Sequence, residues 1–153
     1  MSDIKTILNL IKEQDVKYVD FRFTDPLGQW HHLAHHVSTV NEDLLTEGVM
    51  FDGSSIAGWK AINESDMTLA PDLSTAVLDP FAAQTSLIIY CDVLEPLTGQ
   101  NYGRDPRSIA KRAEAFVKSS GVGDTIYVGP EAEFFVFDDV RYTVSMQKTS
   151  VEF

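Results

Sequence analysis

Two glutamates near the carboxyl-terminal end have the clearest potential for chemistry. Residues 129–137 read Gly-Pro-Glu-Ala-Glu-Phe-Phe-Val-Phe, which places acids at Glu131 and Glu133. In a β-strand these carboxylates lie on one face, about 6–7 Å apart along the strand axis. Because ionised carboxylates among apolar residues need a cation, the pattern favours a divalent metal such as Mg²⁺ or Mn²⁺. The spacing by itself is equally compatible with two acids at an exposed strand end marked by Pro130.

A second candidate segment combines one acid with small residues. Residues 51–59 read Phe-Asp-Gly-Ser-Ser-Ile-Ala-Gly-Trp. Glycine and serine permit tight turns close to a ligand, so Asp52 could act as a base with Ser55 as its hydrogen-bond partner. Composition alone favours a plain Asp-Gly turn by about two to one. Trp59 could be a packing residue or a stacking platform, and packing is the commoner role.

The histidines and the cysteine offer weaker candidates. His31 and His32 are followed by His35 and His36 in an alternating segment that predicts a strand. A strand places these rings on opposite faces, which argues against a zinc site. Cys91 lies in an apolar run, where a small buried residue is commoner than a nucleophile. The sequence contains no phosphate loop of the Gly-x4-Gly-Lys type.

Composition limits the classes of protein to which the chain can belong. Its 153 residues suffice for one domain or slightly more, and 44% hydrophobic with 23% charged residues is typical of a soluble globular protein. Twelve Lys and Arg against twenty-three Asp and Glu give a net charge of −11, which argues against nucleic acid or anionic lipid as a partner. A single cysteine, a charged amino terminus and no apolar run near 20 residues predict a cytoplasmic protein without a membrane segment.

The amino-terminal two thirds predict one helix followed by strands. Apolar residues at helical spacing predict a helix over 3–14 with Ser2 as its N-cap. Alternation predicts strands over 18–23 and 29–37, joined by a turn at 25–28. Further strands are expected at 75–78 and 86–93.

The carboxyl-terminal third predicts a second unit. Asp105 and Pro106 are typical of a helix start, and Gly121 is typical of a helix end. A strand over 125–137 is expected next, and apolar residues on both of its faces predict burial. We therefore divide the chain into 1–103 and 104–153. The apolar-polar mixture at Phe153 suggests a chain that has been cut short.

Four segments together resemble bacterial type I glutamine synthetases. Phe-Asp-Gly-Ser-Ser at 51–55 and Asn-Glu-Ser-Asp-Met at 63–67 are similar to the amino-terminal signature of that family. Tyr-Gly-Arg-Asp-Pro-Arg at 102–107 resembles the segment that joins its two domains, and residues 129–134 resemble its first metal-binding strand. The resemblance covers essentially the whole chain, in the same order and spacing.

The resemblance implies an α+β fold: a β-grasp-like amino-terminal domain followed by the first helix and strand of a truncated catalytic domain. Members of the family make glutamine from glutamate and ammonium with ATP as substrate, through a γ-glutamyl phosphate, in nitrogen assimilation. By carry-over, Glu131 and Glu133 each contribute to one of two Mg²⁺ or Mn²⁺ sites, Glu133 towards glutamate and Glu131 towards the ATP phosphates.

The resemblance also implies an oligomer. Asp52 is associated with binding and deprotonating ammonium, and Ser55 belongs to the same loop, which enters the site of the adjacent subunit of a dodecamer. Trp59 and Asp66 fall near that interface. Most of the nucleotide pocket, the remaining metal ligands and the regulatory tyrosine of some members lie downstream of Phe153, so this fragment is expected to be inactive alone.

Two other functions remain compatible with the sequence. The parent protein could be a related ligase that joins glutamate to a larger amine. The chain could also be a complete, non-catalytic interaction module that pairs with glutamine synthetase rings through an exposed apolar edge.

Overall fold

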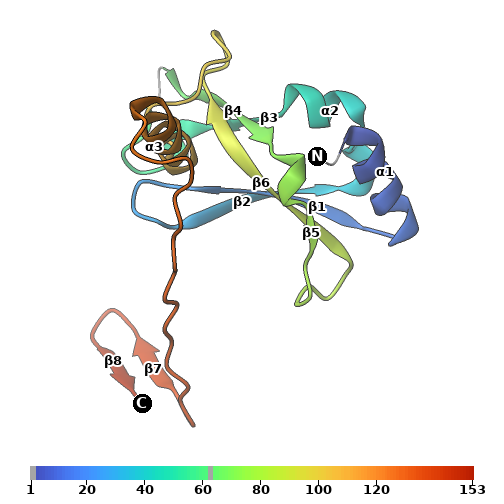
Figure 1. Ribbon diagram of the computed structural model, residues 1–153. Helices are drawn as coiled ribbons and strands as arrows, with labels where there is room; N and C mark the ends of the chain where they lie inside the picture. The colour runs from blue at the N-terminus through green and yellow to red at the C-terminus, as the bar shows by residue number, and fades with distance from the viewer. Residues whose placement is uncertain (1–2, 62–63) are drawn as a thin grey trace.

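A mixed β-sheet with two helices on one face forms the body of the protein (Figure 1). The computed structural model describes residues 3–61 and 64–153. The strand order is β2-β1-β6-β4-β3, with β5 paired to β6. β1 and β6 are parallel, and the other pairs are antiparallel. The strands are β1 (Tyr18–Thr24), β2 (Trp30–His36), β3 (Val49–Asp52), β4 (Asp66–Pro71), β5 (Val77–Leu78) and β6 (Ser86–Leu94).

Helices α1 (Ile4–Glu13) and α2 (Glu42–Glu47) contribute to the same core as the sheet. Ile7 and Ile11 of α1 are buried, as the helical spacing predicts. The predicted cap was wrong: Asp3 is the N-cap and accepts from the backbone N–H of Thr6 at 2.8 Å. Ser2 lies outside the described residues.

The predicted hairpin is confirmed, with slightly different ends. Gly28 N–H donates to the Asp25 carbonyl at 3.0 Å and closes the turn between β1 and β2. The four histidine rings contact strand neighbours: His31 stacks on Phe23. On the opposite face, His32 lies 2.6 Å from a carboxylate oxygen of Asp20.

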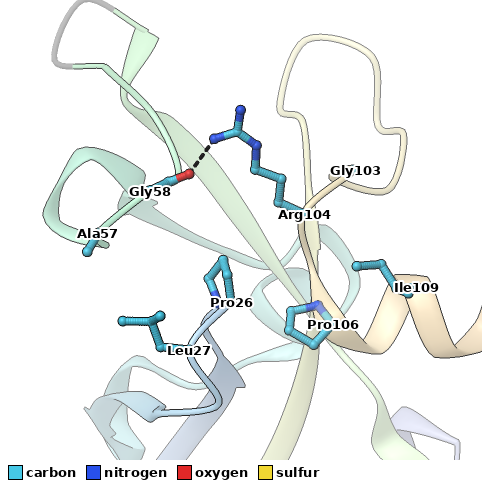
Figure 2. Close-up of a pocket in the computed structure, with 8 residues that line it drawn as sticks. All are labelled: Pro26, Leu27, Ala57, Gly58, Gly103, Arg104, Pro106 and Ile109. Carbon is cyan, nitrogen blue, oxygen red and sulfur yellow. Dashed lines mark hydrogen bonds between the residues drawn. The ribbon is translucent and has the colours of Figure 1, made fainter.

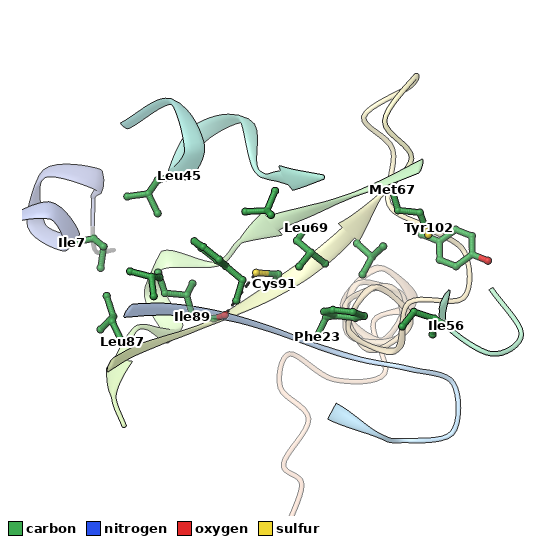
Figure 3. Close-up of a cluster of buried hydrophobic side chains, with 14 of the residues drawn as sticks. Ile7, Phe23, Leu45, Ile56, Met67, Leu69, Leu87, Ile89, Cys91 and Tyr102 are labelled. Atoms are coloured by element: carbon green, nitrogen blue, oxygen red, sulfur yellow. Dashed lines mark hydrogen bonds between the residues drawn. The ribbon is translucent and has the colours of Figure 1, made fainter. Parts of the chain in front are cut away.

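The core lies between the helices and the central strands (Figure 3). Phe21, Leu69 and Ile89, from three neighbouring strands, have no exposed surface. Cys91 is also fully buried, as predicted, and burial raises the pKa of its thiol. The strand predicted at 75–78 is shorter, because residues 73–75 form a 3₁₀ turn and only Val77–Leu78 pairs with β6.

Helix α3 (Pro106–Ser120) begins and ends where the sequence predicts. Asp105 caps it, accepting from the backbone N–H groups of Arg107 and Ser108. Gly121 ends the helix with φ of +71°, a left-handed conformation that favours glycine. Ile109 and Phe116 remain exposed on its surface. No described helix is long and apolar enough to cross a membrane.

The strand predicted over 125–137 is absent. The segment runs away from the body without strand pairing, and a separate hairpin of β7 (Arg141–Val144) and β8 (Thr149–Glu152) follows it (Figure 1). The predicted burial is also wrong, because Phe134 and Phe135 are 83% and 86% exposed. A strand forms only when neighbouring backbone satisfies its N–H and C=O groups, and no described strand lies beside this segment.

Candidate functional site

The Asp52 loop (residues 52–60) begins at the end of β3, at one edge of the sheet. Gly53–Ser55 forms a 3₁₀ turn, and the N–H of Gly53 donates to the Ser65 carbonyl at 2.7 Å. A side chain at Gly53 would clash with its neighbours, because an added Cβ would lie 2.4 Å from the sulfur of Met67. Glycine is therefore needed here for close packing against β4.

The Asp52 carboxylate is held by both serines that follow it. Oδ1 accepts from the N–H of Ser54 at 2.8 Å and from its hydroxyl at 2.6 Å, and Oδ2 accepts from the Ser55 hydroxyl at 3.2 Å. The hydroxyl of Ser54 is the largest of the influences that lower the pKa of Asp52. The group is exposed and anionic near neutral pH.

The sequence analysis anticipated Ser55 as a partner of Asp52 but missed Ser54. The missed contact has a local signal, because an Asp side chain commonly accepts from the backbone N–H two residues later. The pattern Asp-Gly-Ser therefore predicts Ser54 as the nearer partner. The expectation of a turn at Asp52-Gly53 is confirmed.

A second acid lies directly opposite Asp52. Asp66, the first residue of β4, is its register partner in the antiparallel pair. Residues directly opposite each other share a face of the sheet, and like charges there are unfavourable. Within residues 3–61 and 64–153, Asp52 and Asp66 form no ion pair with a basic side chain. This strand end would therefore attract a small cation.

The rest of the Asp52 loop is fastened by two buried side chains, Ile56 and Trp59. The Trp59 ring lies 5.6 Å from the Phe23 ring and 5.5 Å from the Tyr102 ring, measured between centroids. Trp59 is thus a packing residue. Its ring N–H is buried and has no hydrogen-bond partner among the described residues.

A cavity of about 640 Å³ lies beside this loop (Figure 2). Apolar groups dominate its lining, including Pro26, Leu27 and Ile109, and Arg104 supplies the charged group. The Arg104 guanidinium donates to the Gly58 carbonyl. Asp52 is not part of the lining, so the cavity and the carboxylate are separate features.

Glu131 and Glu133 are not brought together with Asp52. Both lie exposed in the extended segment that leaves the body after α3 (Figure 1). Throughout the described part of the chain, no three His, Cys, Asp or Glu side chains cluster closely enough to hold a metal. Carboxylates are suitable ligands for Mg²⁺ or Mn²⁺, but two of them cannot complete the shells of two ions.

Comparison with protein families gives two matches in succession. Residues 15–96 match the glutamine synthetase β-grasp domain, and residues 103–153 match the glutamine synthetase catalytic domain.

Individual proteins agree with these matches. The glutamine synthetase of Azospirillum brasilense is 65% identical over 153 residues, which is 100% of this chain and 33% of that protein. The Bradyrhizobium diazoefficiens glutamine synthetase is 65% identical over 149 residues, covering 97% of this chain and 32% of that protein. A cryo-EM structure of Plasmodium falciparum glutamine synthetase superposes with a TM-score of 0.83 at 31% identity, over 99% of this chain and 29% of that one. The chain thus spans about a third of the length of the curated relatives it matches.

Proposed function

Because the chain belongs to the glutamine synthetase family, we propose that it forms the amino-terminal third of an ATP-dependent ligase that joins ammonia to glutamate. The observation that carries this proposal is the similarity over the whole chain: two family matches in order, and 65% identity from end to end. The expected intermediate is a γ-glutamyl phosphate. Glutamine made in this way serves nitrogen assimilation in the cytoplasm.

Asp52 is the proposed ammonium-binding residue. Its carboxylate is exposed, its pKa is lowered and it forms no ion pair with a described basic residue. Asp66 opposite adds a second negative charge. An anionic site of this kind favours ammonium over neutral ammonia.

Proton removal from ammonium requires a change in the surroundings of Asp52. A lowered pKa suits cation binding but makes the carboxylate a weaker base. Burial of the loop against an adjacent subunit would raise the pKa of Asp52 and improve it as a proton acceptor. This requirement supports a site shared between subunits of a ring, which in this family we expect to be a dodecamer. Ser55 would then hold Oδ2 in place during the transfer.

Glu131 and Glu133 are the proposed metal ligands of this chain. Each would supply one carboxylate to one of two Mg²⁺ or Mn²⁺ sites, with Glu133 towards glutamate and Glu131 towards the ATP phosphates. When bound, such ions neutralise the charge that develops during phosphoryl transfer. The other ligands and most of the nucleotide pocket would come from residues outside this chain.

We also place the division between the two domains near residue 103, giving 1–103 and 104–153. Support comes from the family matches, which end at residue 96 and resume at residue 103. A tyrosine that is modified in some family members would lie outside this chain.

The role of Asp52 is tested in a protein of the relatives' full length. Asp52→Ala should lower the rate of glutamine formation about a hundredfold or more, the usual range for removing a proton-transfer group. Asp43→Ala, at an exposed acid in the first turn of α2, is the matched control. Equal activity of both variants across an ammonium titration would sink the assignment of Asp52.

The metal role is tested by titrating Mg²⁺ or Mn²⁺. Glu133→Ala should raise the metal concentration that gives half-maximal activity by about tenfold or more. Glu13→Ala, at the exposed end of α1, is the control. An unchanged metal requirement in Glu133→Ala would remove this residue from the proposed ligand set.

A further inference from the structure

We propose that Tyr102 and Arg104 are positioning residues that hold the far end of the Asp52 loop and thereby orient Asp52. The inference rests on the proposed ammonium-binding function of Asp52. The contacts that carry it lie outside the turn that holds the carboxylate itself. They join residues 58–60 to Glu95, Tyr102 and Arg104, which lie at least 35 positions later in the chain.

Tyr102 makes the most buried of these attachments. Its hydroxyl donates to the Trp59 carbonyl at 2.9 Å, and its ring meets the Trp59 ring edge-on. The two residues are 7% and 5% exposed. Without this hydroxyl, the buried Trp59 carbonyl would lose its nearer donor and keep only the Arg104 guanidinium at 3.5 Å, so the hydroxyl specifies the position of the loop in addition to the ring packing.

Arg104 makes a second attachment one residue away. Its Nη1 group donates to the carbonyl of Gly58 (Figure 2). The same group reaches the Trp59 carbonyl at 3.5 Å. Arginine suits this place because its planar guanidinium can serve two neighbouring acceptors at once. Two adjacent carbonyls of the loop are therefore bound by side chains from one short segment.

Lys60 attaches the loop from its own side. Its ammonium group donates to both carboxylate oxygens of Glu95 at 2.8 Å and lies 5.4 Å from the centre of the Tyr102 ring. The hydrogen bond with Glu95 is the largest influence that raises the pKa of Lys60. The loop end is thus fastened at three consecutive residues.

The anchoring segment is itself firmly held. Tyr102 N–H donates to the Val93 carbonyl at 2.8 Å, and Asp105 N–H donates to the Tyr102 carbonyl at 3.1 Å. The fully buried Asp105 caps α3 and also accepts from the Val93 N–H. Residues 102–105 therefore connect the central strand β6, the start of α3 and the Asp52 loop, so a shift of α3 against the sheet would move the loop.

Tyr102→Phe tests the proposal in a protein of full family length, because it removes one oxygen and keeps the ring. Tyr18→Phe is the matched control: Tyr18 is more exposed, and its hydroxyl bonds to no described residue. We expect amide hydrogen exchange in residues 53–60 to become about three- to tenfold faster in Tyr102→Phe, the range expected for one lost hydrogen bond. The KM for ammonium should rise by a similar factor while the KM for ATP stays constant.

Arg104 provides a second, independent test with its own rescue. Arg104→Met should speed exchange in the same residues, and Arg104→Lys should restore part of the protection because an ammonium group can still donate to the Gly58 carbonyl. A purely structural role would instead speed exchange across the whole sheet and change both KM values together.

Three results would overturn the proposal: unchanged exchange in residues 53–60, exchange that increases equally throughout the chain, or an ammonium KM that does not move although the loop has loosened. Failure of the proposed function has a different signature. In that case Asp52→Ala leaves ammonium use intact, whatever Tyr102→Phe does to hydrogen exchange.

Discussion

Two turns of this protein share one local design and differ in their surroundings. Asp52-Gly53-Ser54 and Asp72-Leu73-Ser74 each begin a 3₁₀ turn with an aspartate cap. In both, one carboxylate oxygen accepts from the serine N–H and, at 2.6 Å, from the serine hydroxyl.

The second carboxylate oxygen distinguishes the two turns. Oδ2 of Asp72 accepts from Arg107 at 2.6 Å, and the same guanidinium binds Asp92. Oδ2 of Asp52 accepts only from the Ser55 hydroxyl among the residues the structure describes. One charge is therefore neutralised and fastens α3 to the sheet, whereas the other remains free to attract a cation. The same local motif thus acquires a structural or a ligand-binding role from its tertiary neighbours.

The largest effect on stability is expected from removing the cation of the structural turn. Arg107→Met leaves Asp72 and part of Asp92 without a partner and should lower the free energy of unfolding by about 1–3 kcal/mol. Arg141→Met, which breaks an exposed pair with Asp139, should change it by less than about 0.5 kcal/mol. Urea denaturation measures the free energy of unfolding of both variants. Equal decreases would show that the Arg107 pairs stabilise the fold no more than the exposed Arg141 pair does.

Removing the aspartates themselves should give unequal losses. Asp72→Ala removes a cap and one arm of the ion pair, with an expected loss of about 1–2 kcal/mol in the free energy of unfolding. Asp52→Ala removes the equivalent cap with its local hydrogen bonds but no ion pair, and should cost clearly less. Thermal unfolding of the two variants measures this difference. A larger decrease in the free energy of unfolding in Asp52→Ala would contradict the structural role assigned to the Asp72 turn.

Acid should weaken the Asp72 turn more than the Asp52 turn, because protonation of Asp72 breaks an ion pair as well as hydrogen bonds, whereas Asp52 has hydrogen bonds alone among the described residues. Burial raises the pKa of Asp72, but hydrogen bonds from Ser74 and the charge of Arg107 lower it further than burial raises it. A lowered pKa stabilises the fold above the pKa of the unfolded chain, about 3.9, and this stabilisation disappears as the pH falls through the folded pKa. In Asp72→Asn the free energy of unfolding should therefore depend less on pH below about pH 4 than in the parent protein. Asp52→Asn should reduce this dependence by a smaller amount. If the free energy of unfolding fell with pH equally in both variants and in the parent protein, the difference between the two turns would be contradicted.

The smallest effect is expected on single pKa values. Ser54→Ala removes the hydroxyl that contributes most to lowering the pKa of Asp52, so that pKa should rise towards its ordinary range. In Ser74→Ala the pKa of Asp72 should stay lower, because Arg107 and Lys111 remain nearby. Carbon-13 NMR titration of the carboxyl groups gives both values. If the pKa of Asp72 in Ser74→Ala returned fully to its ordinary value, Arg107 would not be a cause of its lowered pKa.

Much of the body could be predicted because its signals are local. The N-cap at Asp105 with Pro106 and the left-handed Gly121 define both ends of α3 within a few residues. The turn at 25–28 likewise joins two alternating strands as predicted. The cap of α1 was misplaced by one residue, to Asp3, since several polar residues can serve as a cap, and the strand expected at 75–78 was too long. Helix α2 and strands β3 and β4 were not predicted.

The residues of the candidate site could be predicted from the sequence, but the tertiary contacts that hold its loop could not. The segment Asp-Gly-Ser-Ser contains its own hydrogen-bonding partners, so Asp52 and Ser55 could be named from sequence, and Ser54 could have been. The attachment of the loop to Tyr102 and Arg104 has no sequence signal, because more than 40 residues separate the groups that meet.

By itself, the sequence determined the family and the local turns, since these depend on residue types and short spacings. Only the tertiary structure decided which aspartate is neutralised, because Arg107 reaches Asp72 from α3 and no basic residue in the described part of the chain pairs with Asp52. It also decided that residues 125–137 form no strand, although their pattern is typical of one. A strand depends on a neighbour to accept and donate its backbone hydrogen bonds, and that neighbour is a property of the whole fold.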